Sequence, residues 1–152
     1  MPLLIALLAI TFNIVNAGFN GLALFFWQPV EATALNLGLT SLAGLFLFGM
    51  GFCIHLHSDQ VLRGLRSSTS SPSTEYQIPN KGLHRWVSSP NYLGELIQWF
   101  GFALLINNLA AWSFFIWTGA NLIPRAIANR AWYKTTFTDY PGHRTALIPF
   151  LF

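Results

Sequence analysis

Residues 96–124, LIQWFGFALLINNLAAWSFFIWTGANLIP, carry no charged side chain. The same is true of residues 1–30 and of residues 32–58. A helix needs roughly 20 apolar residues to cross the hydrocarbon core of a bilayer. Helices buried in a soluble protein would still have polar outer faces, and these blocks show none. The three blocks therefore predict an all-α integral membrane protein.

Composition supports this class and argues against others. Only 9% of the 152 residues are charged and 53% are hydrophobic, whereas soluble domains carry about 25% charged residues. The formal net charge is +3, but the basic residues gather beside the apolar blocks, as in cytoplasmic loops. We therefore expect no nucleic-acid binding. The single cysteine, Cys53, lies in an apolar block and cannot form an internal disulfide.

One membrane domain of four spans, residues 1–152, accounts for the blocks. The first block lacks a basic start and is too long for a signal peptide. The last block is too long for one helix, and INNLAA near its centre predicts a turn, while Ser89 and Pro90 suit a helix start. We expect transmembrane helices at about residues 3–27, 35–57, 90–106 and 109–133.

The basic residues predict the orientation of these helices. They lie between the second and third spans or at and after the end of the fourth, so four spans place them all on one side. That side is the cytoplasmic one, together with both termini. Residues 67–74, SSTSSPST, predict a flexible cytosolic loop. The membrane is expected to be the endoplasmic reticulum in a eukaryote and the inner membrane in a bacterium.

Two polar stripes interrupt the apolar helices. His55, Asp59, Arg63 and Arg66 share one helix face by their spacing. They indicate either an interfacial face, with Asp59 paired to Arg63, or part of a site. Asn91, Glu95, Gln98 and Trp99 share a face of the third span. Ionisable groups inside membrane bundles usually mark functional sites, so this stripe favours a polar ligand.

The remaining polar residues carry weaker signals. Arg125 and Tyr133 fall on nearly one face of the last helix, where they either anchor it at the interface or reach back into the bundle. His55 and His57 point about 200° apart on a helix and cannot share an ion. No metalloprotease, Rossmann or serine-hydrolase motif is present. The residues alone therefore predict no metal site.

Four segments taken together resemble the C-terminal half of the steroid 5-alpha-reductase family. They are GMGFCIHLHSDQVLRGLR, EYQIPNKGLHRWVSSPNYLGELIQWFGFAL, PRAIANRAWYKTTFTDYP and HRTALIPFLF. Their order and spacing match, most strongly over residues 45–152. The resemblance implies a membrane reductase that uses NADPH to reduce a carbon–carbon double bond conjugated to a carbonyl, in a steroid or related lipid. It also implies the C-terminal part of a seven-helix bundle.

Matching the family motifs gives the residues expected to contact NADPH. They are Asp59, Arg66, Tyr76, Asn91, Glu95, Trp99, Arg125 and Tyr133. His55 stands where the family commonly has asparagine, and Asn129 and Arg130 stand where it commonly has histidine. The family's N-terminal helices, which polarise the substrate carbonyl, have no counterpart here, so no catalytic residue is assigned. A complete active site would then need a partner protein that supplies those helices. Membrane lipid is a second expected partner.

Three alternatives stay open at this point. A very-long-chain enoyl-CoA reductase shares the PNY and DYP motifs and the same chemistry. A membrane methyltransferase that uses S-adenosylmethionine carries HPxYxG at the head of a helix, but SPNYLGE here lacks the histidine. An inactive, truncated membrane protein is the third alternative.

Overall fold

A computed structural model describes residues 2–27, 38–67 and 77–151, and its regular secondary structure over these ranges is helical. Apart from an isolated bridge between Val87 and Thr145, the described residues form no β-structure. The elements are α1 (Pro2–Leu22), a π-helical turn η1 (Ala23–Trp27), α2 (Leu39–Ser67), a 3₁₀ turn η2 (Gly82–Arg85), α3 (Pro90–Ile106) and α4 (Leu109–Thr136). The all-α prediction is confirmed. Most of the expected loop at 67–74 lies outside the described residues.

One described segment is long and apolar enough to cross a membrane by length and composition, Leu39–Leu65 in α2. Ala6–Leu22 in α1 is a shorter apolar helix. The helices expected at about 90–106 and 109–133 are present as α3 and α4. The division into a helical hairpin is therefore confirmed, whereas the number of membrane crossings stays a prediction.

Two asparagines end one helix of this hairpin and start the next. Asn107 adopts a left-handed conformation with φ 48°, which asparagine tolerates better than most residues. The Asn108 side chain then accepts a hydrogen bond of 2.8 Å from the Ala111 backbone and caps α4. At the other end of α3, Ser89 is the N-cap and Pro90 the first helical residue, as the sequence predicts.

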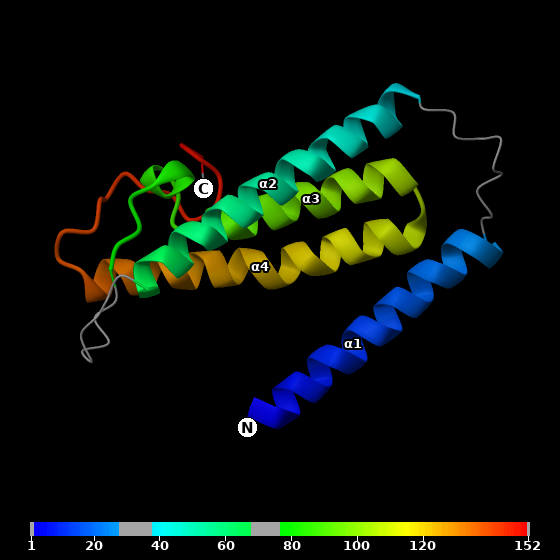
Figure 1. Ribbon diagram of the computed structural model, residues 1–152, viewed down its shortest axis with the longest axis horizontal. Coiled ribbons are helices and arrows are strands. Elements are labelled where there is room, and N and C mark those ends of the chain that lie inside the picture. The colour runs from blue at the N-terminus through cyan, green and yellow to red at the C-terminus, as the bar shows by residue number, and fades with distance from the viewer. Residues whose placement is uncertain (1, 28–37, 68–76, 152) are drawn as a thin grey trace.

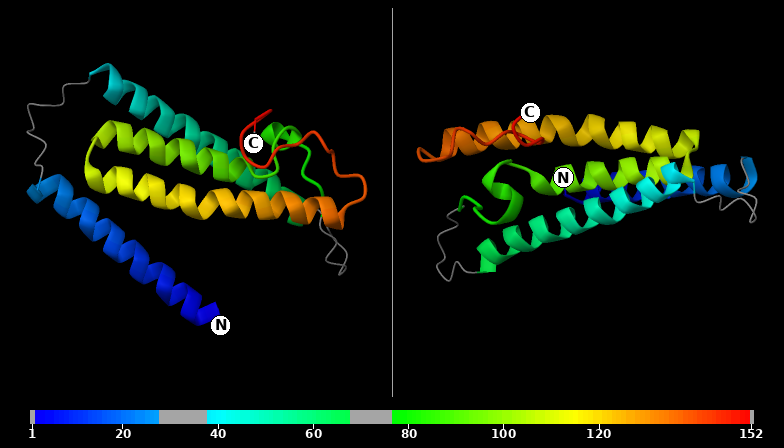
Figure 2. Two further views of the ribbon diagram at one scale, coloured as in Figure 1. Left: turned by 180° about the vertical axis from the view of Figure 1, so that it is seen from behind. Right: turned by 90° about the horizontal axis from the view of Figure 1, so that it is seen from above.

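In the bundle, α3 lies between α2 and α4, and α1 lies beside α4 at an angle to the other helices (Figure 1; Figure 2). The contact between α2 and α3 is made backbone to backbone through glycines. A Cβ atom added to Gly51 would lie 2.5 Å from the Gly94 carbonyl oxygen, and one added to Gly94 would lie 2.5 Å from the His55 backbone nitrogen. Gly44 and Gly101 repeat the arrangement two turns further along. Small residues are what lets membrane helices approach this closely.

A cap of two segments, residues 77–89 and 140–151, covers the end of the bundle where α3 begins (Figure 1). The Ser88 backbone donates to the Thr145 carbonyl at 2.9 Å, and the Ser88 hydroxyl bonds the Tyr140 hydroxyl at 2.7 Å. The Arg144 guanidinium is only 3% exposed and donates to the Pro79 carbonyl at 2.9 Å and to the Asn80 side chain. The two segments are thereby fixed to each other.

The cap is also tied to the helices. Leu147 and Ala146 are buried against Ala126 of α4 and against Tyr92, Leu93 and Leu96 of α3. In addition, Arg130 of α4 donates to the Arg144 carbonyl at 2.7 Å. These contacts fix the first turns of α3, where the polar stripe of the sequence begins.

Replacing Gly51 by alanine tests the helix contact. Because its Cβ would meet backbone atoms of α3, which cannot rotate away, we expect Gly51→Ala to lower the free energy of unfolding by about 2 kcal/mol or more. Gly49→Ala is the matched control, since a Cβ there meets nothing within 4 Å. The control is expected to be neutral or stabilising, because alanine favours helix by up to about 1 kcal/mol. Thermal unfolding in detergent measures both, and equal effects would contradict this packing.

Candidate functional site

The candidate site is the polar face of α3. Gly94 and Gly101 face α2, and Leu93 and Leu96 face the core shared with α4. Asn91, Glu95 and Trp99 follow one another at intervals of four residues, so they share a face between these two contacts. All three are half-buried. The predicted polar stripe of α3 is therefore one continuous surface.

Across the glycine contact, α2 brings two more polar groups to the same end of the bundle. His55 Nδ1 lies 3.3 Å from the backbone oxygen of Asn91, at hydrogen-bonding distance. His55 Nε2 lies 3.8 Å from a carboxylate oxygen of Asp59, one turn further along α2. The interfacial alternative paired Asp59 with Arg63, but among the described residues no ion pair joins these two, and the Asp59 carboxylate lies next to His55 instead.

The side chains of Asn91 and Glu95 are left with unused hydrogen-bonding capacity. Within the described part of the chain, neither the Asn91 amide nor the Glu95 carboxylate forms a side-chain hydrogen bond, and Glu95 forms no ion pair. A half-buried carboxylate without a partner is costly inside an apolar bundle. The face is therefore suited to a ligand that brings hydrogen-bond donors.

Trp99 connects this polar face to an apolar cavity on its other side. Its ring contacts Phe114 of α4 edge to face, with centroids 4.5 Å apart. Phe114 in turn lies against Phe12 of α1 at 6.5 Å, and Phe12 lies 5.6 Å from Trp117. These rings form a continuous row from α3 to α1.

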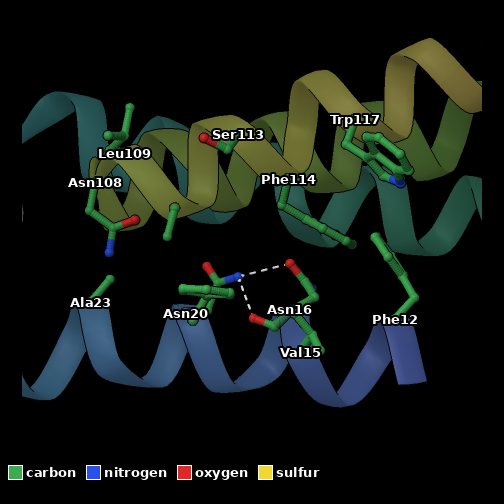
Figure 3. A pocket seen from close by; sticks show the side chains of 12 residues that line it. Phe12, Val15, Asn16, Asn20, Ala23, Asn108, Leu109, Ser113, Phe114 and Trp117 are labelled. Carbon is green, nitrogen blue, oxygen red and sulfur yellow. Dashed lines mark hydrogen bonds between the residues drawn. The ribbon is translucent and has the colours of Figure 1, made fainter. Parts of the chain in front are cut away.

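A cavity of about 590 Å³ lies between α1 and α4 beside this row (Figure 3). Aromatic and aliphatic side chains form most of its lining, with a few polar groups among them. Asn20 donates to the backbone and side-chain oxygens of Asn16, at 3.0 and 3.1 Å (Figure 3). The Asn20 Oδ1 atom is buried and has no partner among the described residues. The cavity suits an apolar molecule with at least one polar group.

The other four predicted contact residues are not brought to the polar face of α3 by the described structure. Tyr76 is outside the described residues, and Arg66 is in α2 but its side chain is not described. Arg125 is exposed on α4 and does not reach back into the bundle. Tyr133 stacks on Tyr140 with centroids 5.2 Å apart, so it belongs to the cap end. The structure thus brings together Asn91, Glu95 and Trp99 with Asp59 nearby.

Sequence reasoning missed two groups. Asn16 and Asn20 lie one turn apart in an otherwise apolar block, a spacing that could have marked them as a polar stripe. Asn129, noted only as a departure from the family pattern, donates to the Ser89 hydroxyl at 3.3 Å and links α4 to the start of α3. No local pattern identifies that bond, because its partners are far apart in the chain.

Comparison with known proteins identifies the family to which the chain belongs. The family model for 3-oxo-5-alpha-steroid 4-dehydrogenase matches residues 1–152, the whole chain. The chain belongs to this family. Steroid 5-alpha-reductase DET2 of Solanum lycopersicum is 40% identical over 155 residues, which cover 99% of this chain and 57% of the relative. The resemblance of the four sequence segments is thereby confirmed.

Two mammalian members of the 3-oxo-5-alpha-steroid 4-dehydrogenase family match a shorter part. The type 1 protein of Bos taurus is 41% identical over 110 residues, and the human type 2 protein is 43% identical over 109 residues. Each match covers 72% of this chain and 42% of the relative. The matches thus cover only about half the length of these three curated relatives, from 42% to 57%.

In this member of the family, the cap beside the site holds a buried histidine. His84 is 1% exposed, and neither ring nitrogen meets hydrogen-bond geometry with a described residue. Burial is the main reason that the pKa of His84 is lowered from 6.5 to about 4, and the charges of Arg144 and His57 lower this pKa further. The nearby Ser58 backbone acts in the other direction and raises the pKa. Burial dominates because it disfavours the charged imidazolium. His84 is therefore neutral at pH 7.

This histidine predicts a loss of stability in acid. Between pH 6.5 and about 4 the unfolded chain binds a proton at His84 that the folded chain does not, so stability falls as the pH falls. We expect the loss to reach about 1–3 kcal/mol. His84→Phe removes the group, so its unfolding temperature should depend less on pH over this range. His143→Gln, which removes an exposed imidazole, is the control, and an unchanged slope in His84→Phe would contradict the assignment.

Proposed function

We propose that this chain binds NADPH along the polar face of α3, formed by Asn91, Glu95 and Trp99, and takes part in reducing a carbon–carbon double bond conjugated to a carbonyl. The substrate we propose is a steroid or a related lipid, held in the cavity between α1 and α4. The observation that carries the proposal is the contact of Trp99 with Phe114 at 4.5 Å, because it joins the polar face to the apolar cavity. Family membership gives the reaction class, since the relatives are named as steroid 5-alpha-reductases and 3-oxo-5-alpha-steroid 4-dehydrogenases.

The polar face fits the cofactor by its hydrogen-bonding groups. Nicotinamide carries an amide and ribose carries hydroxyl groups, and both donate hydrogen bonds. The Glu95 carboxylate accepts such bonds, and the Asn91 amide can both donate and accept. Neither side chain is committed to another described residue. A bond to the charged carboxylate contributes about 1.5–3 kcal/mol.

Charge at the cap end of the bundle suits the phosphates. Arg63 is exposed on α2 two turns beyond His55, and Arg125 is exposed on α4 one turn before the Asn129 link to α3. Arginine pairs bidentately with phosphate oxygens. We extend the proposal to Arg66 and Tyr76 from the family motifs. Tyr133, stacked on Tyr140, would then border the cofactor through the cap.

The chain's own residues would orient and shield the reactants. When bound, NADPH supplies the hydride that the double bond accepts. The apolar rings of Trp99 and Phe114 would keep water away from the place where the polar face meets the cavity. The unpartnered Asn20 Oδ1 can accept a hydrogen bond from a hydroxyl of the lipid and so fix its orientation.

Replacing Glu95 by glutamine tests the cofactor half. The variant keeps the shape but removes the charged acceptor, so we expect NADPH affinity to fall about 10- to 150-fold. Titration of the purified, folded protein with NADPH measures it. Asp139→Asn, which neutralises an exposed carboxylate in the cap region, should leave the affinity unchanged. Saturable binding of S-adenosylmethionine in place of NADPH would refute the reductase assignment.

Replacing Phe114 by alanine tests the lipid half separately. Loss of the ring from the cavity wall should weaken binding of a 3-oxo-Δ4 steroid by about 1–2 kcal/mol, roughly 5- to 30-fold. NADPH affinity should change much less. Phe115→Ala is the matched control, because Phe115 contacts Phe100 and Trp112 instead of the cavity. Equal effects of the two variants, or tighter binding of an enoyl-CoA than of the steroid, would contradict a steroid site.

A further inference from the structure

A second cavity lies beside α2, where the turn η2 packs against it. It has a volume of about 560 Å³ and lies between α2 and the turn η2. Its lining combines thiol, aliphatic, imidazole, hydroxyl, guanidinium and indole groups, from Cys53, Ile54, His57, Ser58, Leu83, Arg85 and Trp86. It is distinct from the proposed reductase site, because none of its lining residues lines the cavity between α1 and α4 or belongs to the polar face of α3.

The charge of this cavity is positive. The exposed Arg85 donates from Nε to the Asn80 carbonyl at 3.3 Å, and it forms no ion pair with a carboxylate in residues 38–67 or 77–151. No aspartate or glutamate lines the cavity. Its guanidinium therefore has two terminal nitrogens available for an anion, and phosphate is the anion that arginine matches in geometry.

The cavity opens onto an apolar stripe along α2. The stripe consists of Leu39, Leu42, Phe46, Met50 and Cys53, all of them exposed. These residues, and His57 after them, follow one another at intervals of three or four, so they share one helix face. Gly51 and His55 lie on the opposite face, against α3. An acyl chain could therefore run along the stripe while its polar head occupies the cavity.

Two exposed aromatic residues at the edge of the cavity, Trp86 and Phe150, which we call the aromatic lip, indicate that the cavity lies at the headgroup level of the membrane. Trp86 is 45% exposed and lies 6.4 Å from the ring of Phe150, which is 85% exposed. Leu151 beside it is 80% exposed. Tryptophan concentrates at the headgroup level of bilayers, and exposed apolar side chains next to basic ones are typical of segments inserted there.

We propose that this cavity binds the headgroup of an anionic phospholipid, with the phosphate at Arg85 and one acyl chain along the stripe of α2. A free phosphate would satisfy Arg85 but leave the stripe and the aromatic lip uncovered. A zwitterionic lipid would cover the stripe but bring no net charge to the unpaired guanidinium. The combination therefore selects an anionic lipid, and the site is independent of the proposed reductase function.

Retention of lipid tests the proposal directly. The full chain is purified from membranes containing phosphatidylserine and phosphatidylcholine, and native mass spectrometry measures which lipid stays bound. We expect wild type and Arg85→Lys to retain phosphatidylserine preferentially and Arg85→Gln to lose the preference. Lys134→Gln, which removes an exposed charge at the end of α4, should keep it. Circular dichroism confirms that each variant is folded.

The single cysteine locates the bound lipid. Cys53 lines the cavity, so uncharged N-ethylmaleimide should modify it more slowly in nanodiscs with phosphatidylserine than in phosphatidylcholine alone. At ten times the dissociation constant the slowing is about tenfold, and Arg85→Gln should abolish it. Equal loss of the lipid preference in Lys134→Gln, no preference in wild type, or equal protection by soluble glycerophosphoserine would each overturn the proposal.

Discussion

The contact between α2 and α3 through facing glycines sets the position of everything else in the structure. A residue with a side chain at Gly51 or Gly94 would meet the backbone of the other helix. Because both positions are glycine, the two helices lie close enough for His55 to reach the Asn91 backbone. The polar residues of α2 and α3 therefore lie at the same end of the bundle. In a membrane protein, lipid offers no hydrophobic drive for helices to associate, and close packing of this kind is what stabilises helix pairs there.

The same contact divides α2 into two faces with different surroundings. One face carries the glycines, His55 and Asp59 toward α3, and the other carries the apolar stripe that ends at His57. Since residues two apart on a helix point in nearly opposite directions, His55 and His57 serve different surfaces although they are close in sequence. The angular separation of about 200° that helical geometry predicts thus places His55 against α3 and His57 in the second cavity.

Local chemistry accounts for the parts that could be predicted. Ser89 and Pro90 start α3, the Asn107–Asn108 pair ends it and caps α4, and helical periodicity groups Asn91, Glu95 and Trp99. Partners across the fold could not be predicted in this way. A spacing of four residues places Asp59 within reach of both His55 and Arg63, so spacing alone could not tell which of the two lies against the carboxylate. Arg144 is buried because the Pro79 carbonyl and the Asn80 side chain, far away in sequence, accept its hydrogen bonds. The residues next to Arg144 in sequence contain no information about those partners.

The cap explains why a buried arginine and a neutral buried histidine are tolerated together. Arg144 brings a positive charge into the cap, and it is compensated by the Pro79 carbonyl, the Asn80 side chain and the face of the Tyr140 ring at 5.3 Å. A second buried charge nearby would add repulsion and desolvation, so His84 stays neutral. The cap thus keeps one buried positive charge, that of Arg144, beside the start of α3, at the end of the bundle where the proposed cofactor's phosphates would lie.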